Sequence, residues 1–141
     1  MLHSFLLIFK PRGHLGPGFS TQASFFDYDG DGDLDVYVMN YPGEWDARLV
    51  VMQKEGLEIP FRFRDHLFRN DGKAGFVEVG LEAGINNLAF GLGLITADFN
   101  EDGWTDIYVA NDYLEADYLY INQKDGTFVE SMKSFCNHNS Q

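Results

Sequence analysis

The sequence contains two copies of one unit, and this repetition restricts the possible folds more than any other feature. Residues 19–40 align with residues 90–111 at a constant offset of 71, and residues 67–78 align with residues 119–130 at an offset of 52. The two offsets differ because the first copy carries an insertion at about residues 42–66. A unit of about 52 residues that recurs in one chain indicates a repeat architecture, in which each unit packs against the next.

Each unit contains four short segments with the composition and alternation typical of β-strands. The predicted strands are residues 22–26, 34–39, 67–70 and 76–79 in the first unit, and 91–97, 105–110, 118–122 and 127–130 in the second. Glycine-containing turns between the third and fourth segments predict hairpins. Units of this length with four strands fit the blades of a β-propeller. We therefore predict an all-β fold with two four-stranded antiparallel blades of a partial propeller.

The insertion and the ends of the chain divide the sequence further. The insertion is predicted to hold a turn or two of helix that ends at Gly56, followed by an extended stretch through residues 60–64. Phe128 predicts that the next repeat would open at position 142. The predicted organisation is a degenerate N-terminal segment at 1–18, a first blade at 19–80, a second blade with its leading connection at 81–131, and a truncated connection to a missing blade at 132–141.

Each unit also carries an acidic loop in which alternate residues bear oxygen. Ca²⁺ requires six to eight oxygen ligands, and a tight loop supplies them from positions 1, 3, 5, 7 and 9, with glycine at position 6 for the bend. The predicted ligands are Asp27, Asp29, Asp31, Asp33 through its carbonyl and Asp35 in the first loop, and Asp98, Asn100, Asp102, Trp104 through its carbonyl and Asp106 in the second. We therefore predict about two calcium ions, one in each loop.

Two other interpretations of the acidic loops are less favoured. An EF-hand requires a bidentate Glu at position 12, where this chain has Val38 and Val109. A solvated acidic turn without metal would explain one loop, but two loops in register with the repeat favour a metal site. The first loop is predicted to bind calcium more tightly, because the second has Asn100 in place of Asp29. Affinities on the order of 10⁻⁵ to 10⁻³ M suit a structural extracellular module.

Composition excludes several classes of partner and chemistry. The formal net charge is −12, with 22 acidic and 10 basic residues, so neither nucleic acid nor an anionic membrane surface is an expected partner. The apolar run near the N-terminus is too short for membrane insertion. Cys136 is the only cysteine, which excludes an internal disulfide and a cysteine-based zinc cluster.

The acidic loops and the segments after them resemble a known repeat. The pattern Asp-x-Asp/Asn-x-Asp-Gly-x-x-Asp, followed by residues 67–70 or 119–122 and by Phe-Val-Glu, is similar to the FG-GAP/VCBS repeat. Residues 76–85 are more similar to the typical sequence of the ASPIC/UnbV (cartilage acidic protein-like) group. The resemblance implies a calcium-bearing propeller of roughly seven blades in an exported protein, at the cell surface, outside the cell or in the periplasm.

Function is predicted from this resemblance and from the lack of a catalytic pattern. The histidines at positions 3, 14, 66 and 138 are scattered, and none lies at a catalytic spacing from a Ser, Cys or carboxylate pair. We therefore expect a non-catalytic scaffold that binds a protein or glycan ligand, together with the missing blades of the parent chain. The alternatives are the propeller portion of a calcium-dependent polysaccharide-processing enzyme, and a fragment without independent function.

Overall fold

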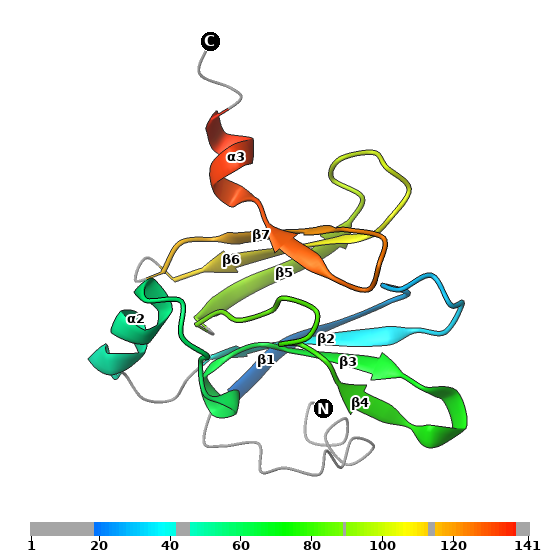
Figure 1. Cartoon of the computed structure of the whole chain (residues 1–141), viewed down its shortest axis with the longest axis horizontal. Coiled ribbons are helices and arrows are strands. Elements are labelled where there is room, and N and C mark those ends of the chain that lie inside the picture. The colour runs from blue at the N-terminus through cyan, green and yellow to red at the C-terminus, as the bar shows by residue number, and fades with distance from the viewer. Residues whose placement is uncertain (1–18, 42–45, 89, 113–114, 138–141) are drawn as a thin grey trace.

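The computed structural model describes residues 19–41, 46–88, 90–112 and 115–137, and they form two four-stranded antiparallel sheets (Figure 1). The first sheet contains β1 (Phe19–Phe26), β2 (Asp35–Tyr41), β3 (His66–Asn70) and β4 (Phe76–Glu78), and the second contains β5 (Gly91–Ala97), β6 (Asp106–Asn111), β7 (Tyr118–Asn122) and β8 (Phe128–Glu130). Within each sheet, the strands are paired in the order in which they follow one another in the chain. This confirms the predicted all-β fold, and the two sheets are consistent with blades of a partial propeller.

The strand boundaries repeat between the two sheets. The second strands β2 and β6 begin at Asp35 and Asp106, one residue after the predicted start in each case. The first strands β1 and β5 both contain a register shift near their beginning, between Ser20 and Gln22 and between Gly91 and Gly93. The two units therefore agree in their irregularities as well as in their regular pairing.

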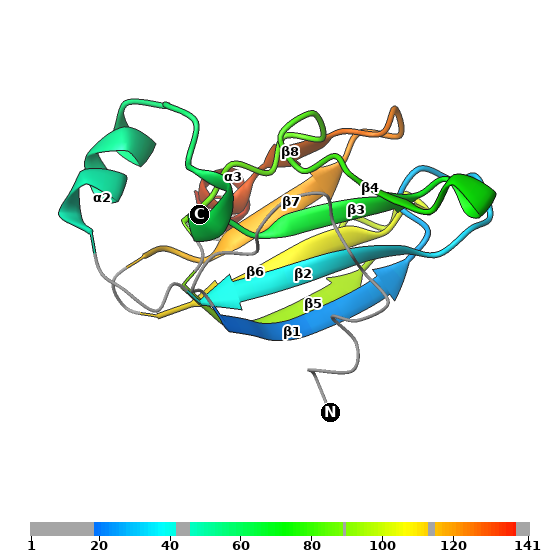
Figure 2. The ribbon, with the colours of Figure 1, turned by 90° about the horizontal axis from the view of Figure 1, so that it is seen from below.

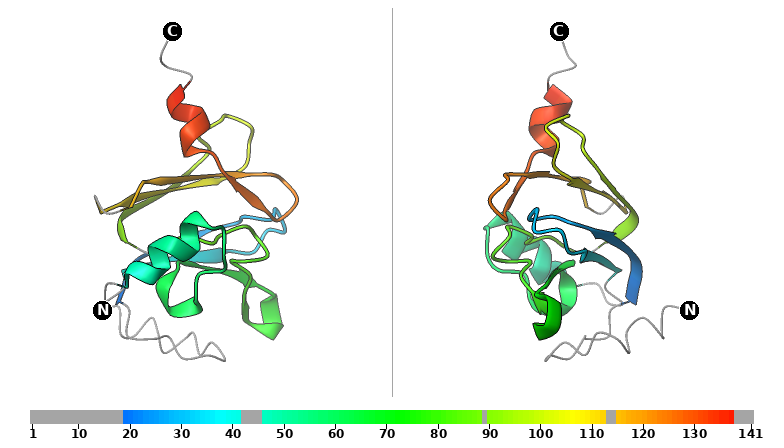
Figure 3. Two further views of the ribbon diagram at one scale, coloured as in Figure 1. Left: turned by 60° about the vertical axis from the view of Figure 1, so that its left-hand side comes forward. Right: turned by 90° about the vertical axis from the view of Figure 1, so that its right-hand side faces the viewer.

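The two sheets lie face to face, as the views in Figures 2 and 3 show. The shared core is built from side chains that are almost completely buried, among them Tyr37 and Leu67 of the first sheet and Ile107 and Tyr120 of the second. Burying such side chains is the main contribution to the stability of a sheet pair. Strand alternation therefore explains the packing: one face of each sheet supplies the common core.

The first strands of the two sheets are also joined by polar contacts. The Gln22 side chain donates to the carbonyl of Leu94 at 3.1 Å and accepts from the N–H of Leu94 at 3.0 Å. The hydroxyls of Ser24 and Thr96 lie 2.7 Å apart. These bonds satisfy polar groups between β1 and β5 and fix the position of one sheet against the other.

The insertion contains the predicted helix, α2 (Ala47–Lys54). The Asp46 side chain caps it by accepting from the N–H of Arg48 at 2.9 Å, and Gly56 beyond its end has a φ of +68°. The predicted extended stretch through 60–64 is wrong, because residues 61–63 form the 3₁₀ turn η1 (Phe61–Phe63). Pro60 accepts from the N–H of Phe63 at 2.9 Å, and the turn buries Phe63 in a second apolar cluster.

The helix α3 (Met132–Asn137) follows β8, in the segment that the sequence assigned to a connection. The predicted N-terminal segment 1–18 and residues 138–141 lie outside the described residues. Among the described residues, no helix has the length and apolar character needed to cross a membrane.

Candidate metal centre

Both acidic loops connect the first and second strands of their sheets and lie at the same end of the molecule, on the right of Figure 1. In the first loop, the Asp27 carboxylate accepts from the N–H groups of Gly30 and Gly32 at 2.8 and 3.0 Å. In the second, Asp98 accepts from the N–H of Gly103 at 2.8 Å. Gly32 and Gly103 have φ values of +93° and +88°, so the predicted bend occurs at the predicted glycine in both loops.

The last acidic residue of each loop is completely buried and holds the loop to its sheet. Asp35 accepts from the N–H of Tyr28 at 3.0 Å and from the N–H of Asn70, at the end of β3, at 2.8 Å. Asp106 accepts two equivalent backbone bonds, both at 2.9 Å, one of them from Asn122 at the end of β7. The sequence identified both residues only as ligands. Each carboxylate retains free lone pairs for a further partner.

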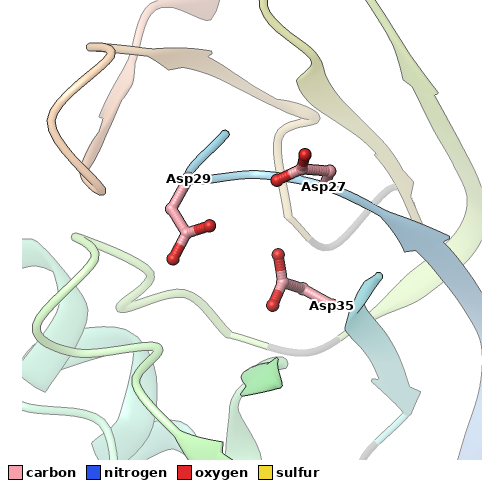
Figure 4. Close-up of side chains that lie close together, drawn as sticks. All are labelled: Asp27, Asp29 and Asp35. Carbon is pink, nitrogen blue, oxygen red and sulfur yellow. The ribbon is translucent and has the colours of Figure 1, made fainter. Parts of the chain in front are cut away.

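Three side chains of the first loop converge on one point. Asp27, Asp29 and Asp35 each direct a carboxylate oxygen into a group whose members lie within 4.8 Å of one another (Figure 4). Burial raises the pKa of Asp29, and the carboxylates of Asp31 and Asp27 raise it further against a hydrogen bond from the Asp31 N–H. Burial also raises the pKa of Asp35. An all-oxygen donor set with an excess of negative charge fits a hard cation such as Ca²⁺.

Two further predicted residues of the first loop do not join this group. Asp31 accepts from the N–H of Asp33 at 2.9 Å, and both side chains are exposed. The carboxylate of Asp31 shapes the turn in this way, and its role as a calcium ligand stays a prediction. The carbonyl of Asp33 stays a predicted ligand, since the sequence assigned no role to its side chain.

The second loop has a different pattern of contacts. Asn100 donates to one oxygen of Asp102 at 3.0 Å, and the N–H of Trp104 donates to the other at 2.9 Å. The ammonium of Lys124 lies 3.4 Å from the Asp102 carboxylate and donates to the Asp102 carbonyl at 3.3 Å. Burial raises the pKa of Asp102, but the hydrogen bonds from Trp104, Asn100 and Lys124 outweigh it and lower the pKa. Within residues 98–106, all of them described, no three acidic side chains converge as they do in the first loop.

The two loops touch each other, which sequence reasoning missed. A Cβ atom placed on Gly30 of the first loop would lie 2.8 Å from Cη2 of the Trp104 ring in the second loop. The Asn122 side chain adds a hydrogen bond to the carbonyl of Tyr28 at 2.8 Å. The sequence assigned only the carbonyl of Trp104 a role, and nothing local in the pattern indicates where the ring lies. The contact means that the conformations of the loops are not independent.

A second repeated cluster lies at the other end of the strands, and the sequence analysis also missed it. Buried Asp65 accepts from the hydroxyl of Tyr37 at 2.7 Å and from the N–H of Asn40 at 2.8 Å. Asp117 receives the two equivalent bonds in the second sheet, at 2.6 and 2.8 Å. We call each of these three-residue clusters the strand corner. Because Asp65 and Asp117 are 52 residues apart, the repeat offset could have revealed the pair.

Comparison with known protein families gives a match to the second repeat. Residues 98–139 match the family model described as an FG-GAP-like repeat, and no curated protein matches the chain. The match begins at the first residue of the second acidic loop and includes β6, β7 and β8. FG-GAP repeats occur in the β-propeller domains of adhesion and binding proteins. The finer ASPIC/UnbV grouping is not confirmed, and the match supports the FG-GAP resemblance through the second repeat of this chain.

Proposed function

We propose that this chain is a calcium-binding β-propeller repeat module of an exported protein, and that it serves as a scaffold for a protein or glycan ligand rather than as a catalyst. The observation that carries the proposal is the convergence of Asp27, Asp29 and Asp35 at the end of a four-stranded sheet. The match of the second repeat to the FG-GAP family supports it.

In this proposal the three converging carboxylates and the carboxylate of Asp31 hold the first ion, with the carbonyl of Asp33 as a further ligand. In the second loop the ligands are Asp98, Asn100, Asp102, Asp106 and the carbonyl of Trp104. A bound Ca²⁺ would supply positive charge that removes the repulsion between carboxylates. Because each loop is tied to its sheet by a buried Asp, an ion in the loop would stabilise the packed strands as well.

The surface beside the first loop supports the proposed role as a scaffold. A cleft of about 400 Å³ lies between the two repeats, with Tyr28 and Asp29 of the first loop, Val79 and Ala83 of the connection, and Lys124 of the β7–β8 hairpin among its lining residues. The lining is more polar than that of most small-molecule pockets, so the cleft would suit a polar ligand group. His66 is the one described histidine, and it is only 1% exposed, so it does not face a substrate.

Isothermal titration calorimetry with Ca²⁺ tests the metal assignment, with Mg²⁺ as the comparison ion. We expect about two calcium sites in the intact chain, and loss of the stronger one in the double variant Asp27→Asn, Asp29→Asn, which removes two carboxylates and keeps one acceptor oxygen at each position. A thermal melt should show stabilisation of about 2.7 kcal/mol at a hundredfold excess of Ca²⁺ over Kd. A folded chain that shows no heat of binding and no change in its melt with Ca²⁺ would disprove the assignment.

A further inference from the structure

The β7–β8 hairpin places a cation on the second acidic loop. Lys124 reaches both the carboxylate and the carbonyl of Asp102, at 3.4 and 3.3 Å. Its own backbone is fixed, because its N–H donates to the Asn122 side chain at 2.8 Å and its φ is +67°. The Lys124 ammonium therefore stands where an added cation would otherwise balance the charge of Asp102.

Among the described residues, no lysine or arginine forms an ion pair with a carboxylate of the first loop. The residue equivalent to Lys124 is Gly72, which has a similar φ of +59° and no side chain. Arg69 lies beside the first loop and lowers the pKa of Asp29 slightly, but its guanidinium is paired with Asp71 through bonds of 2.7 and 3.3 Å. The two hairpins thus have a similar backbone conformation at this position. Only the β7–β8 hairpin places a lysine ammonium on the neighbouring acidic loop.

We propose that Lys124 is a built-in counter-ion of the second acidic loop and that it sets the calcium affinity of this loop below that of the first. The calcium half of this inference rests on the proposed function. The ion pair between Lys124 and Asp102 belongs to the metal-free chain, so that part of the inference does not depend on calcium binding. An ion that enters the second loop must displace the ammonium from Asp102 or share the carboxylate with it, and either one weakens binding.

The first test isolates the second loop in the full chain with the double variant Asp27→Asn, Asp29→Asn. In this background Lys124→Gln removes the charge and shortens the side chain by one bond, and Lys73→Gln in the β3–β4 hairpin is the matched control. Calorimetry should show that Lys124→Gln tightens calcium binding by roughly two- to fivefold, the effect of one exposed ion pair. Equal affinities for Lys124→Gln and Lys73→Gln would overturn the proposal.

The second test transfers the counter-ion to the first loop. A Cβ on Gly72 would meet only the Asp33 carboxylate, at 3.9 Å, so there is space for a side chain. Gly72→Lys should weaken calcium binding by the first loop by roughly two- to fivefold compared with Gly72→Gln, which imposes the same backbone strain without charge. No difference between these two variants would show that a hairpin cation does not act on the loop.

Thermal melts in a chelator separate this inference from the proposed function. At low salt, Lys124→Gln should melt about 1 to 3 °C below Lys73→Gln, and the difference should fade at high salt. If the intact chain binds no calcium but this difference is found, the proposed function fails and the counter-ion remains. If Lys124→Gln and Lys73→Gln melt together at every salt concentration, the counter-ion itself is disproved.

Discussion

Both acidic loops begin with an Asp that folds the turn and end with a buried Asp that ties the loop to its sheet, but they balance their charge in different ways. In the first loop, burial and neighbouring carboxylates raise the pKa of Asp29. In the second, Asn100 replaces a carboxylate, and Lys124 contacts Asp102, whose pKa is lowered. The repeat thus keeps the residues that shape its backbone, while the charge of the loop varies. A similar turn can therefore present different electrostatic surroundings to an ion.

The largest expected effects test the buried Asp that ends each loop and ties it to its sheet. Asp35→Ala and Asp106→Ala should each lower the free energy of unfolding by about 2 to 5 kcal/mol, because each leaves one buried and one half-buried N–H group without an acceptor. Urea denaturation in a chelator measures this, with exposed Asp33→Ala as the control. A large loss for one variant and none for the other would show that the two loops do not share a common frame.

A smaller effect tests the contact between the loops. Gly30 has a φ of +77° and lies against the Trp104 ring, whereas its equivalent in the second loop is exposed Glu101, with a φ of +59°. Gly30→Ala should cost about 1 to 3 kcal/mol through strain and the clash with the ring. Glu101→Ala should change the free energy of unfolding by less than about 0.5 kcal/mol. Equal costs, measured by urea denaturation, would mean that the Trp104 ring does not press on the first loop.

The smallest effects have opposite signs in the two loops. Ionised Asp29 is disfavoured in the folded chain, a penalty that is complete above its raised pKa and absent below the usual value of 3.8. Asp29→Asn should therefore raise the melting temperature by about 1 to 3 °C at pH 7 and leave it unchanged at pH 3.

Ionised Asp102 is favoured, a stabilisation that is complete above the usual value of 3.8 and is lost as the pH falls through its lowered pKa. Asp102→Asn should lower the melting temperature at pH 7 by about 1 to 3 °C, and this loss should shrink as the pH decreases. Melts in a chelator at both pH values measure the two variants. A shift of the same sign in both would contradict the difference in charge balance.

Much of the fold could be predicted from the sequence, because strand alternation and turn residues are local and occur twice. Residues 91–97 and 118–122 are strands over the predicted ranges, and the predicted helix ends before Gly56. The stretch at 60–64 was predicted wrongly because burial of Phe63 outweighs its local preference for an extended chain. The convergence of Asp27 with Asp35 follows from loop spacing, which is also local.

The contacts that distinguish the loops could not be predicted in the same way. Lys124 lies 22 residues from Asp102, and Trp104 meets Gly30 across the interface of the two sheets. Such contacts depend on how one hairpin lies against one loop and how one sheet packs on the other. A single sequence shows which residues repeat, but not which of them meet.

The strand corner has a consequence for how the unit can change its length. In the first repeat the chain leaves β2 at Tyr41, makes α2 and η1, and returns to Asp65. In the second it leaves β6 at Asn111 and reaches Asp117 within a few residues, with the same pair of bonds. The hydrogen bonds of the strand corner return the chain to the same place in the sheet, whatever segment lies between the strands. A longer loop adds little to the entropic cost of loop closure. Foreign segments grafted between Asn111 and Asp117 should therefore leave the second sheet intact, which makes this position a natural place to add a new surface to the repeat.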